Sequence, residues 1–162
     1  MAKGSGGTRG AAGGMGSASR NGGFNSAERS TLSSVESRFK GYTTEHGAII
    51  DDKGNIIEEK NGGKHSVKMT KSAKDAIFTH NHPGKFGSTF SWDDVAYGVS
   101  NNAKGIRVVI KATGQIHTIT RPKGGWGVTA SDVRNKYYSL TGDNTTRITT
   151  MAKDFGWKFQ IN

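Results

Sequence analysis

The sequence predicts an α+β (mixed α/β) fold, with a central β-sheet flanked by helices, in one domain over residues 26–162. Two patterns support this. Short apolar runs bounded by Gly, Asn and Asp are typical of strands, and apolar residues three or four positions apart are typical of amphipathic helices. Because the two patterns alternate irregularly along the chain, a mixed sheet with helices is expected.

Residues 1–25 are expected to form a flexible basic arm. Nine of the 24 glycines lie within the first 28 residues, where large apolar side chains are scarce. Such a segment buries too little surface to offset the conformational entropy that it would lose on ordering. The rest of the chain is long enough for one hydrophobic core.

The first half of the domain should contain one helix and four strands. In the helix, Leu32, Val35 and Phe39 share one face. Turn residues and apolar runs give the boundaries: a helix over 27–40, a hairpin of 46–51 and 55–58, an alternating strand over 65–69, and a buried strand that begins at Ala76 and ends before Pro83.

The second half should alternate helices and strands. The hairpin signal here is Thr113-Gly114 between two apolar runs. The expected elements are a helix over 91–102, strands over 106–111 and 115–120, helices over 131–140 and 144–154, and a last strand over 157–161.

Composition excludes several classes of protein. No apolar run approaches the roughly 20 residues that a membrane-spanning helix needs, and no signal peptide is visible, so we expect a cytoplasmic protein without membrane contact. The absence of cysteine excludes disulfide bonds and thiolate zinc sites. The net charge of +10, of which +4 lies on residues 1–41, allows nucleic acid as a partner but equally fits an ordinary basic surface.

Residues 80–83, His-Asn-His-Pro, and 91–94, Ser-Trp-Asp-Asp, carry the strongest functional signal. Side chains at i and i+2 of a strand point to the same face, so His80 and His82 can converge. A carboxylate in the first turn of the helix that begins at Ser91 would face the end of this strand. Two imidazoles and one carboxylate, with a fourth position left to water, form the ligand set of a catalytic zinc site. The sequence therefore predicts a metal-dependent hydrolase.

With these residues, the chain resembles the JAMM (MPN+, JAB) metalloprotease-like superfamily, most closely its RadC-type and phage-borne JAB branches. The family pattern is a glutamate on an early strand, a later His-x-His, then a serine with an aspartate three residues beyond. The resemblance covers residues 45 to about 120. It implies a JAB/MPN-like sheet, a zinc cofactor, and hydrolysis of a peptide or isopeptide bond in a protein or peptide substrate.

The resemblance also implies a role for each matching residue. The metal ligands would be His80, His82 and Asp94, the general base would be Glu45, and Ser91 would donate a hydrogen bond to the oxyanion of the tetrahedral intermediate.

The aspartate ligand has an alternative. Eight residues separate His82 from Ser91, one more than is usual in the family, so Asp93 is the ligand if the extra loop residue shifts the register. Ser91 with Asp94 also satisfies the pattern of a helix N-terminal cap, a role that is compatible with metal binding because such a cap would orient the carboxylate.

The general base has an alternative too. Glu58, on the second strand of the first hairpin, competes with Glu45. Its neighbours Glu59 and Lys60 favour a solvated strand end, so Glu45 is preferred. Asn81, between the two histidines, is expected to point away from the metal and to hold a loop.

Three further histidines, His46, His65 and His117, lie in strand patterns without liganding neighbours and are expected to be ordinary surface or core residues.

Two other functions stay open. One is a nucleic-acid-associated, RadC-like protein, including an HNH-type nuclease suggested by the letters His-Asn-His; that motif, however, describes dispersed residues, whereas these three are contiguous and end in proline. The other is a non-catalytic structural or interaction module of a phage, which could be virion-associated.

Overall fold

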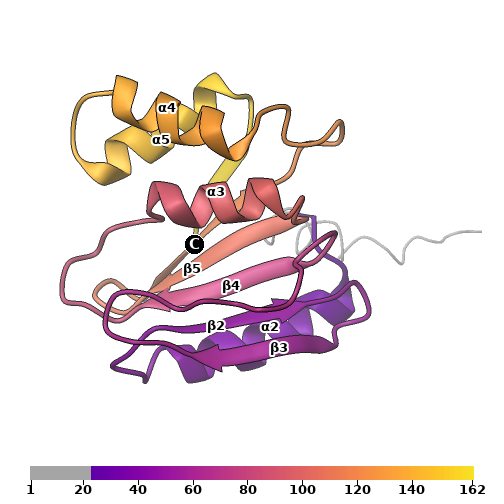
Figure 1. Ribbon diagram of the computed structural model, residues 1–162. Helices are drawn as coiled ribbons and strands as arrows, with labels where there is room; N and C mark the ends of the chain where they lie inside the picture. The colour runs from indigo at the N-terminus through magenta and orange to yellow at the C-terminus, as the bar shows by residue number, and fades with distance from the viewer. Residues whose placement is uncertain (1–22) are drawn as a thin grey trace, which may run out of the picture.

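The computed structural model describes residues 23–162, which form a six-stranded mixed β-sheet with helices on both faces (Figure 1). The elements in chain order are α2 (Ser26–Phe39), β2 (His46–Ile50), β3 (Ile56–Asn61), β4 (Ile77–His82), α3 (Trp92–Ser100), β5 (Gly105–Ile110), β6 (Gln115–Thr120), α4 (Ala130–Ser139), α5 (Asn144–Asp154) and β7 (Lys158–Ile161). The strand order is β3-β2-β4-β5-β6-β7, and β4–β5 is the one parallel pair in this sheet. The expected α+β class is confirmed.

Most of the expected arm, residues 1–22, lies outside the described residues. Phe24 and Asn25, placed in the arm by the sequence, belong to the folded part. The Phe24 side chain is buried in the core under α2. The Asn25 side chain accepts a hydrogen bond from the Glu28 N–H (2.8 Å), and the Glu28 carboxylate accepts one from the Asn25 N–H (2.7 Å). This capping box fixes the start of α2.

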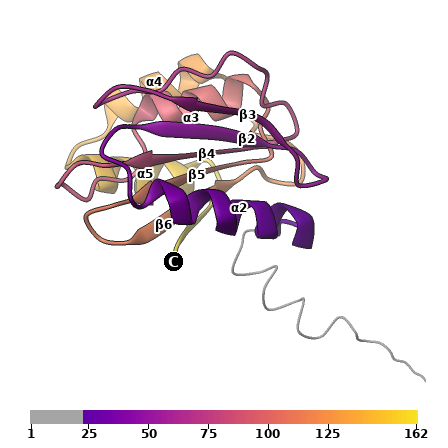
Figure 2. The ribbon, with the colours of Figure 1, turned by 90° about the horizontal axis from the view of Figure 1, so that it is seen from below.

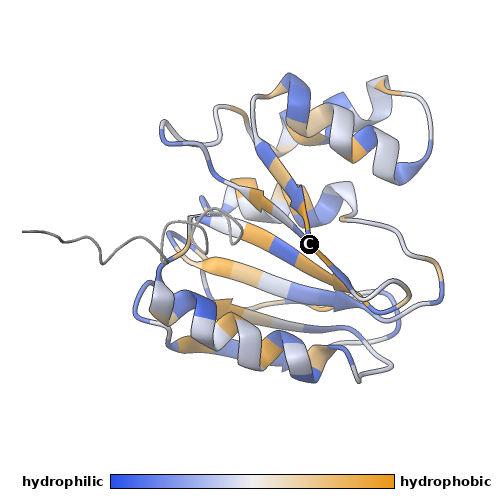
Figure 3. Ribbon diagram, turned by 180° about the vertical axis from the view of Figure 1, so that it is seen from behind, coloured by the Kyte–Doolittle hydropathy of each residue, from blue (hydrophilic) through white to orange (hydrophobic). Residues whose placement is uncertain are grey.

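Helix α2 covers one face of the sheet, while α3, α4 and α5 lie on the other (Figures 1 and 2). Figure 3, seen from behind, shows both hydrophilic and hydrophobic residues along α2, and the residues buried against the sheet include Leu32, Val35 and Phe39, which share one helical face. None of the helices within residues 23–162 has both the length and the apolar character needed to cross a bilayer.

The central strand β4 serves both faces. Ile77 packs into the core under α2, and Phe78 packs into the core under α3. Because side chains alternate along a strand, Asn81 points to the α2 face, and His80 and His82 point to the α3 face. The sequence pattern predicted this shared face for the two histidines.

The prediction of a strand over residues 65–69 is wrong, because this segment has an irregular backbone. It packs against glycines rather than pairing as a strand. A Cβ added at Gly62 would lie 2.1 Å from the Ser66 carbonyl oxygen, and one at Gly47 would lie 2.9 Å from the Met69 sulfur. Directly after this segment, the backbone N–H groups of residues 70 and 71 donate hydrogen bonds to the Glu58 carboxylate. The alternating pattern reflects this packing against β2, not a strand ladder.

A buried ion pair fastens α2 to the sheet. Arg107 of β5 donates two hydrogen bonds to the Glu36 carboxylate of α2, both 2.8 Å long, and a third to the Thr118 hydroxyl (3.0 Å). Thr79 of β4 donates another to Glu36 (2.7 Å). All four residues are buried. Such a pair is stable only while each charge keeps its partners.

The substitution Glu36→Gln is expected to lower the free energy of unfolding by about 3–5 kcal/mol, because it leaves the Arg107 charge buried without a counter-charge. Urea denaturation measures the loss. The matched control is Glu59→Gln, which breaks an ion pair with Arg38 on the surface (2.6 Å) and should lower it by less than about 1 kcal/mol. Equal losses in the two variants would contradict the prediction.

Candidate metal centre

The ligand candidates meet where β4 ends and α3 begins. Pro83 follows β4 directly, and because proline lacks an N–H it cannot continue the ladder. Helix α3 connects β4 to the parallel strand β5, so its N-terminus returns to the carboxyl end of β4. This connection places the first turn of α3 beside His80 and His82.

Three side chains converge at this point. The Asp94 Oδ2 lies 3.1 Å from the His80 Nε2 and 3.4 Å from the His82 Nε2. One ligand atom from each residue lies within 4.8 Å of the others, and this is the one such group of three found among residues 23–162. Donors bonded to a tetrahedral zinc ion at about 2.0–2.1 Å lie about 3.3 Å from one another. The spacing of these three groups therefore fits a divalent ion.

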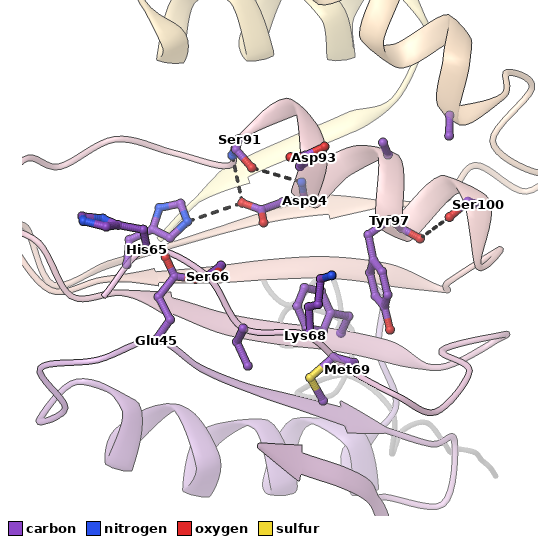
Figure 4. Close-up of a pocket in the computed structure, with 15 residues that line it drawn as sticks. Glu45, His65, Ser66, Lys68, Met69, Ser91, Asp93, Asp94, Tyr97 and Ser100 are labelled. Atoms are coloured by element: carbon purple, nitrogen blue, oxygen red, sulfur yellow. Dashed lines mark hydrogen bonds and ion pairs between the residues drawn. The ribbon is translucent and has the colours of Figure 1, made fainter. Parts of the chain in front are cut away.

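Asp94 has two roles: it belongs to the N-terminal capping box of α3, and its carboxylate lies against the two histidines. Its Oδ2 accepts a hydrogen bond from the Ser91 N–H (2.8 Å), and the Ser91 Oγ accepts one from the Asp94 N–H (3.1 Å). The capping box, drawn in Figure 4, thus holds the carboxylate where its Oδ2 meets the two imidazoles. Asp93 is exposed on the cleft and is not part of the three-residue group. The extra loop residue before Ser91 does not shift the register of the helix.

The two imidazoles have different surroundings. The His82 Nδ1 lies 3.0 Å from the Ser88 carbonyl oxygen. When this nitrogen carries the proton and donates it to the carbonyl, the Nε2 keeps its lone pair for an ion. His80 is fully buried, and neither of its ring nitrogens has a hydrogen-bond partner, although its Nε2 lies close to Asp94. A buried polar atom with few partners is unfavourable, and a bound ion would give the Nε2 of His80 a second partner beside Asp94.

The charges in the group are strongly coupled. Burial raises the pKa of Asp94, but the imidazoles of His80 and His82 lower it more, so its net pKa lies far below the usual range. Burial lowers the pKa of His82, but the Asp94 carboxylate outweighs burial and the net pKa is raised. Asp94 is therefore an anion at neutral pH, as a metal ligand must be.

Glu45 lies in the same cleft, immediately before β2 (Figure 4). Its backbone N–H donates to the Gly63 carbonyl (2.8 Å), and its carbonyl accepts from the Gly62 N–H (2.6 Å). Burial raises the pKa of its carboxyl group, and the imidazoles of His80 and His82 oppose this in part. Glu45 is thus a largely buried carboxyl group within electrostatic range of the two histidines.

Glu58, the alternative base, has a different role. Its Oε1 accepts hydrogen bonds from the N–H groups of Thr70 and Lys71, both 2.9 Å long, and its Oε2 accepts one from the Thr70 hydroxyl. These bonds, the hydroxyl bond first, lower the pKa of Glu58. Glu58 therefore anchors the chain after the irregular segment, and Glu45 is the glutamate that the structure places in the cleft.

The cleft has a volume of about 610 Å³. Residues 65–69, here called the cleft wall, form one side of it, and α3 lies opposite (Figure 4). The end near the candidate ligands is polar. The remainder is lined in part by apolar and aromatic side chains: Val67, Met69, Phe78, Ala96 and Tyr97. The sequence pattern did not reveal this wall; the signal that could have done so is the pair Gly47 and Gly62, which permit its close packing.

The other histidines lie outside the three-residue group. His46 stacks on Tyr42 at 3.8 Å between ring centroids, and the His117 Nδ1 lies 2.7 Å from the Thr89 hydroxyl oxygen. His65 is exposed and belongs to the cleft wall, so it is the one of the three that borders the candidate site.

Comparisons with protein-family models, with curated proteins and with solved structures found no match to this chain. The resemblance to the JAMM superfamily therefore stays a prediction from the motif residues. The fold and the side-chain group define a protein of the mixed α+β class with a candidate binding site for a divalent metal ion.

The substitution Asp94→Asn should weaken the binding of a divalent ion, tested with zinc, by at least about 100-fold, because it removes the anionic ligand candidate while an amide oxygen can still accept the Ser91 N–H. Competition with a chromophoric chelator measures the affinity. Asp93→Asn is the matched control, since it removes the same charge one residue away, and it should change affinity by less than about threefold. Equal weakening in both variants would show that only overall charge matters.

Zinc affinity should rise with pH through neutrality. The ion must displace the proton of His82, whose pKa is raised above 6.5 by Asp94. Competition by this proton therefore persists above pH 6.5, and below its pKa affinity should fall about tenfold per pH unit for each displaced proton. The same chelator competition between about pH 5.5 and 8 tests this. An affinity that is constant over this range would contradict proton displacement from His82.

Proposed function

We propose that this protein is a zinc-dependent hydrolase of the JAMM type that cleaves a peptide or isopeptide bond. The observation that carries the proposal is the meeting of His80, His82 and Asp94 at the polar end of a cleft that also contains Glu45. This set supplies three ligands and one separate carboxylate. Metallohydrolases need these parts together with an open coordination position.

A bound divalent ion would supply Lewis acidity, which lowers the pKa of a coordinated water to about 7. Glu45 would then act as the general base, taking a proton from the attacking water and delivering it to the leaving amine. Its burial supports this role, because the raised pKa of its carboxyl group brings it closer to the working pH of a proton carrier.

Ser91 would contribute a hydrogen-bond donor. Its oxygen accepts the Asp94 N–H within the capping box, and this leaves its hydroxyl proton for another acceptor. The Ser91 side chain borders the cleft beside Asp94. A donor at this place can stabilise negative charge that develops on the carbonyl oxygen of a substrate.

The residues that line the cleft favour a peptide-like substrate. It continues from the ligand end along the cleft wall and α3, where apolar residues alternate with polar ones. A protein or peptide segment offers both backbone amides and apolar side chains to such a surface. The proposed partner is therefore a protein or peptide.

The letters His-Asn-His do not support an HNH-type nuclease. Asn81 bonds to the α2–β2 connection, on the face of β4 opposite the two histidines, so the three residues do not form one site. A plasmid-nicking assay with magnesium or zinc tests nuclease activity directly, and nicking that His80→Ala abolishes would favour the nucleic-acid function over the hydrolase.

Glu45→Gln should lower kcat for peptide or isopeptide cleavage by about 10²–10⁴-fold, because it removes the proton carrier and keeps its shape. The full chain with zinc would be incubated with a peptide library and with isopeptide-linked substrates, and products read by mass spectrometry. Glu58→Gln is the control. Its Oε1 position can still accept the Thr70 and Lys71 N–H groups, so less than about a threefold change is expected.

Two outcomes would contradict the proposal. Equal cleavage by the wild type and Glu45→Gln would exclude Glu45 as the base. A wild-type protein that binds zinc but cleaves no substrate would favour the non-catalytic interaction module instead.

A further inference from the structure

The Asn81 side chain holds the backbone on both sides of Glu45. Its Oδ1 accepts a hydrogen bond from the His46 N–H (2.6 Å), and its Nδ2 donates to the Thr44 carbonyl (3.1 Å). The same Nδ2 donates to the carbonyl of Phe39, the last residue of α2 (3.3 Å). One fully buried amide thus forms hydrogen bonds to the residues that immediately precede and follow the glutamate. The three hydrogen bonds of the Asn81 side chain are here called the clamp.

The backbone of Glu45 itself is held from another side. Its N–H and carbonyl bond to Gly63 and Gly62, in the turn that follows β3. The peptide groups around Glu45 are therefore fixed by two independent sets of hydrogen bonds, one from β4 and one from this turn. A backbone held in this way leaves the carboxylate only its own side-chain rotations, and this is how a site is kept in its working geometry.

We propose that Asn81 is a positioning residue that holds Glu45 at the cleft, without touching the substrate or the ion. This rests on the proposed function of Glu45. Asn81 lies between His80 and His82 in sequence but faces the opposite side of the sheet. Strand β4 therefore carries the two ligand candidates on one face and, on the other, the side chain that holds the backbone of Glu45. The position of the base is thereby tied to the position of the ligands.

A leucine at position 81 could fill the space, and an alanine would leave a cavity, but neither could make these bonds. An aspartate could accept the His46 N–H, but its second oxygen would face the Thr44 and Phe39 carbonyls and would repel them. The amide is the side chain of this size that carries an acceptor on one side and donors on the other. The requirement for asparagine therefore follows from the clamp and not from metal binding.

The test uses the variants Asn81→Ala and Asn81→Asp in the full chain. The matched control is Asn101→Ala. Asn101 also bridges two backbone groups, accepting from the Ala73 N–H (3.1 Å) and donating to the Tyr97 carbonyl (3.0 Å), but it lies at the far end of α3. Any general effect of losing such a bridge appears in this control. Asn81→Asp keeps the bond to the His46 N–H and loses those to the Thr44 and Phe39 carbonyls, so amide exchange at Glu45 and Gly62 should accelerate in it as well.

The first readout needs neither metal nor substrate. Amide hydrogen exchange of Glu45 and Gly62 reports the second set of bonds, which Asn81 does not make itself. Exchange of these two amides should accelerate at least about tenfold in Asn81→Ala and should be unchanged in Asn101→Ala. Zinc affinity should stay within about threefold of wild type, since the ligands and their partners lie on the other face.

The second readout is catalytic. In Asn81→Ala, kcat should fall at least about tenfold with KM unchanged, because the base is displaced while the cleft is intact. Unchanged exchange at Glu45 and Gly62, cleavage at the wild-type rate, or loss of zinc affinity as large as in His80→Ala would each overturn the positioning role. If exchange accelerates with zinc affinity kept but the wild type cleaves nothing, Asn81 does hold Glu45 and the hydrolase proposal fails.

Discussion

The two-sided character of β4 is the constraint on which the rest of the molecule depends. The strand lies inside the sheet, between β2 and β5, and its two faces are covered by α2 on one side and α3 on the other. Its alternate side chains therefore serve two separate environments. Ile77 and Phe78 fill the two cores, and beyond them the same alternation sends polar groups in both directions. A shift of register by one residue would exchange the two sets completely.

Polar groups buried on both faces of one strand need partners, and the two faces meet this need differently. On the α2 face both polar side chains of β4 are satisfied by protein: Thr79 bonds to Glu36, and Asn81 bonds to three backbone groups. On the α3 face the His80 Nδ1 has no hydrogen-bond partner, and the His80 Nε2 has only the Asp94 carboxylate beside it, 3.1 Å away. This contrast between the two faces of one strand makes the α3 face the candidate binding face.

The charges on that face lead to the same conclusion. Asp94 is an anion in a largely buried place, and it raises the pKa of the His82 imidazole. A divalent cation would compete with a proton for His82 and would also bind the Nε2 of His80. The arrangement is therefore better matched to a metal ion than to protons alone, and the capping box of α3 keeps the carboxylate in place in either state.

The sequence could predict what depends on local spacing and could not predict what depends on distant segments. The histidine pair and the cap are set by positions within fifteen residues, so strand alternation and helix capping were sufficient. The cleft wall was misread because alternation is the same for a strand and for an extended segment lying on a sheet; only its contact with Gly47 and Gly62 distinguishes them. The Asn81 side chain forms hydrogen bonds to His46 and Thr44, which lie 35 and 37 positions earlier in the chain, and no local pattern encodes such contacts. The resemblance to a family supplied Glu45, and the clamp on its neighbours gives a physical reason, independent of that resemblance, why this glutamate lies beside the histidines.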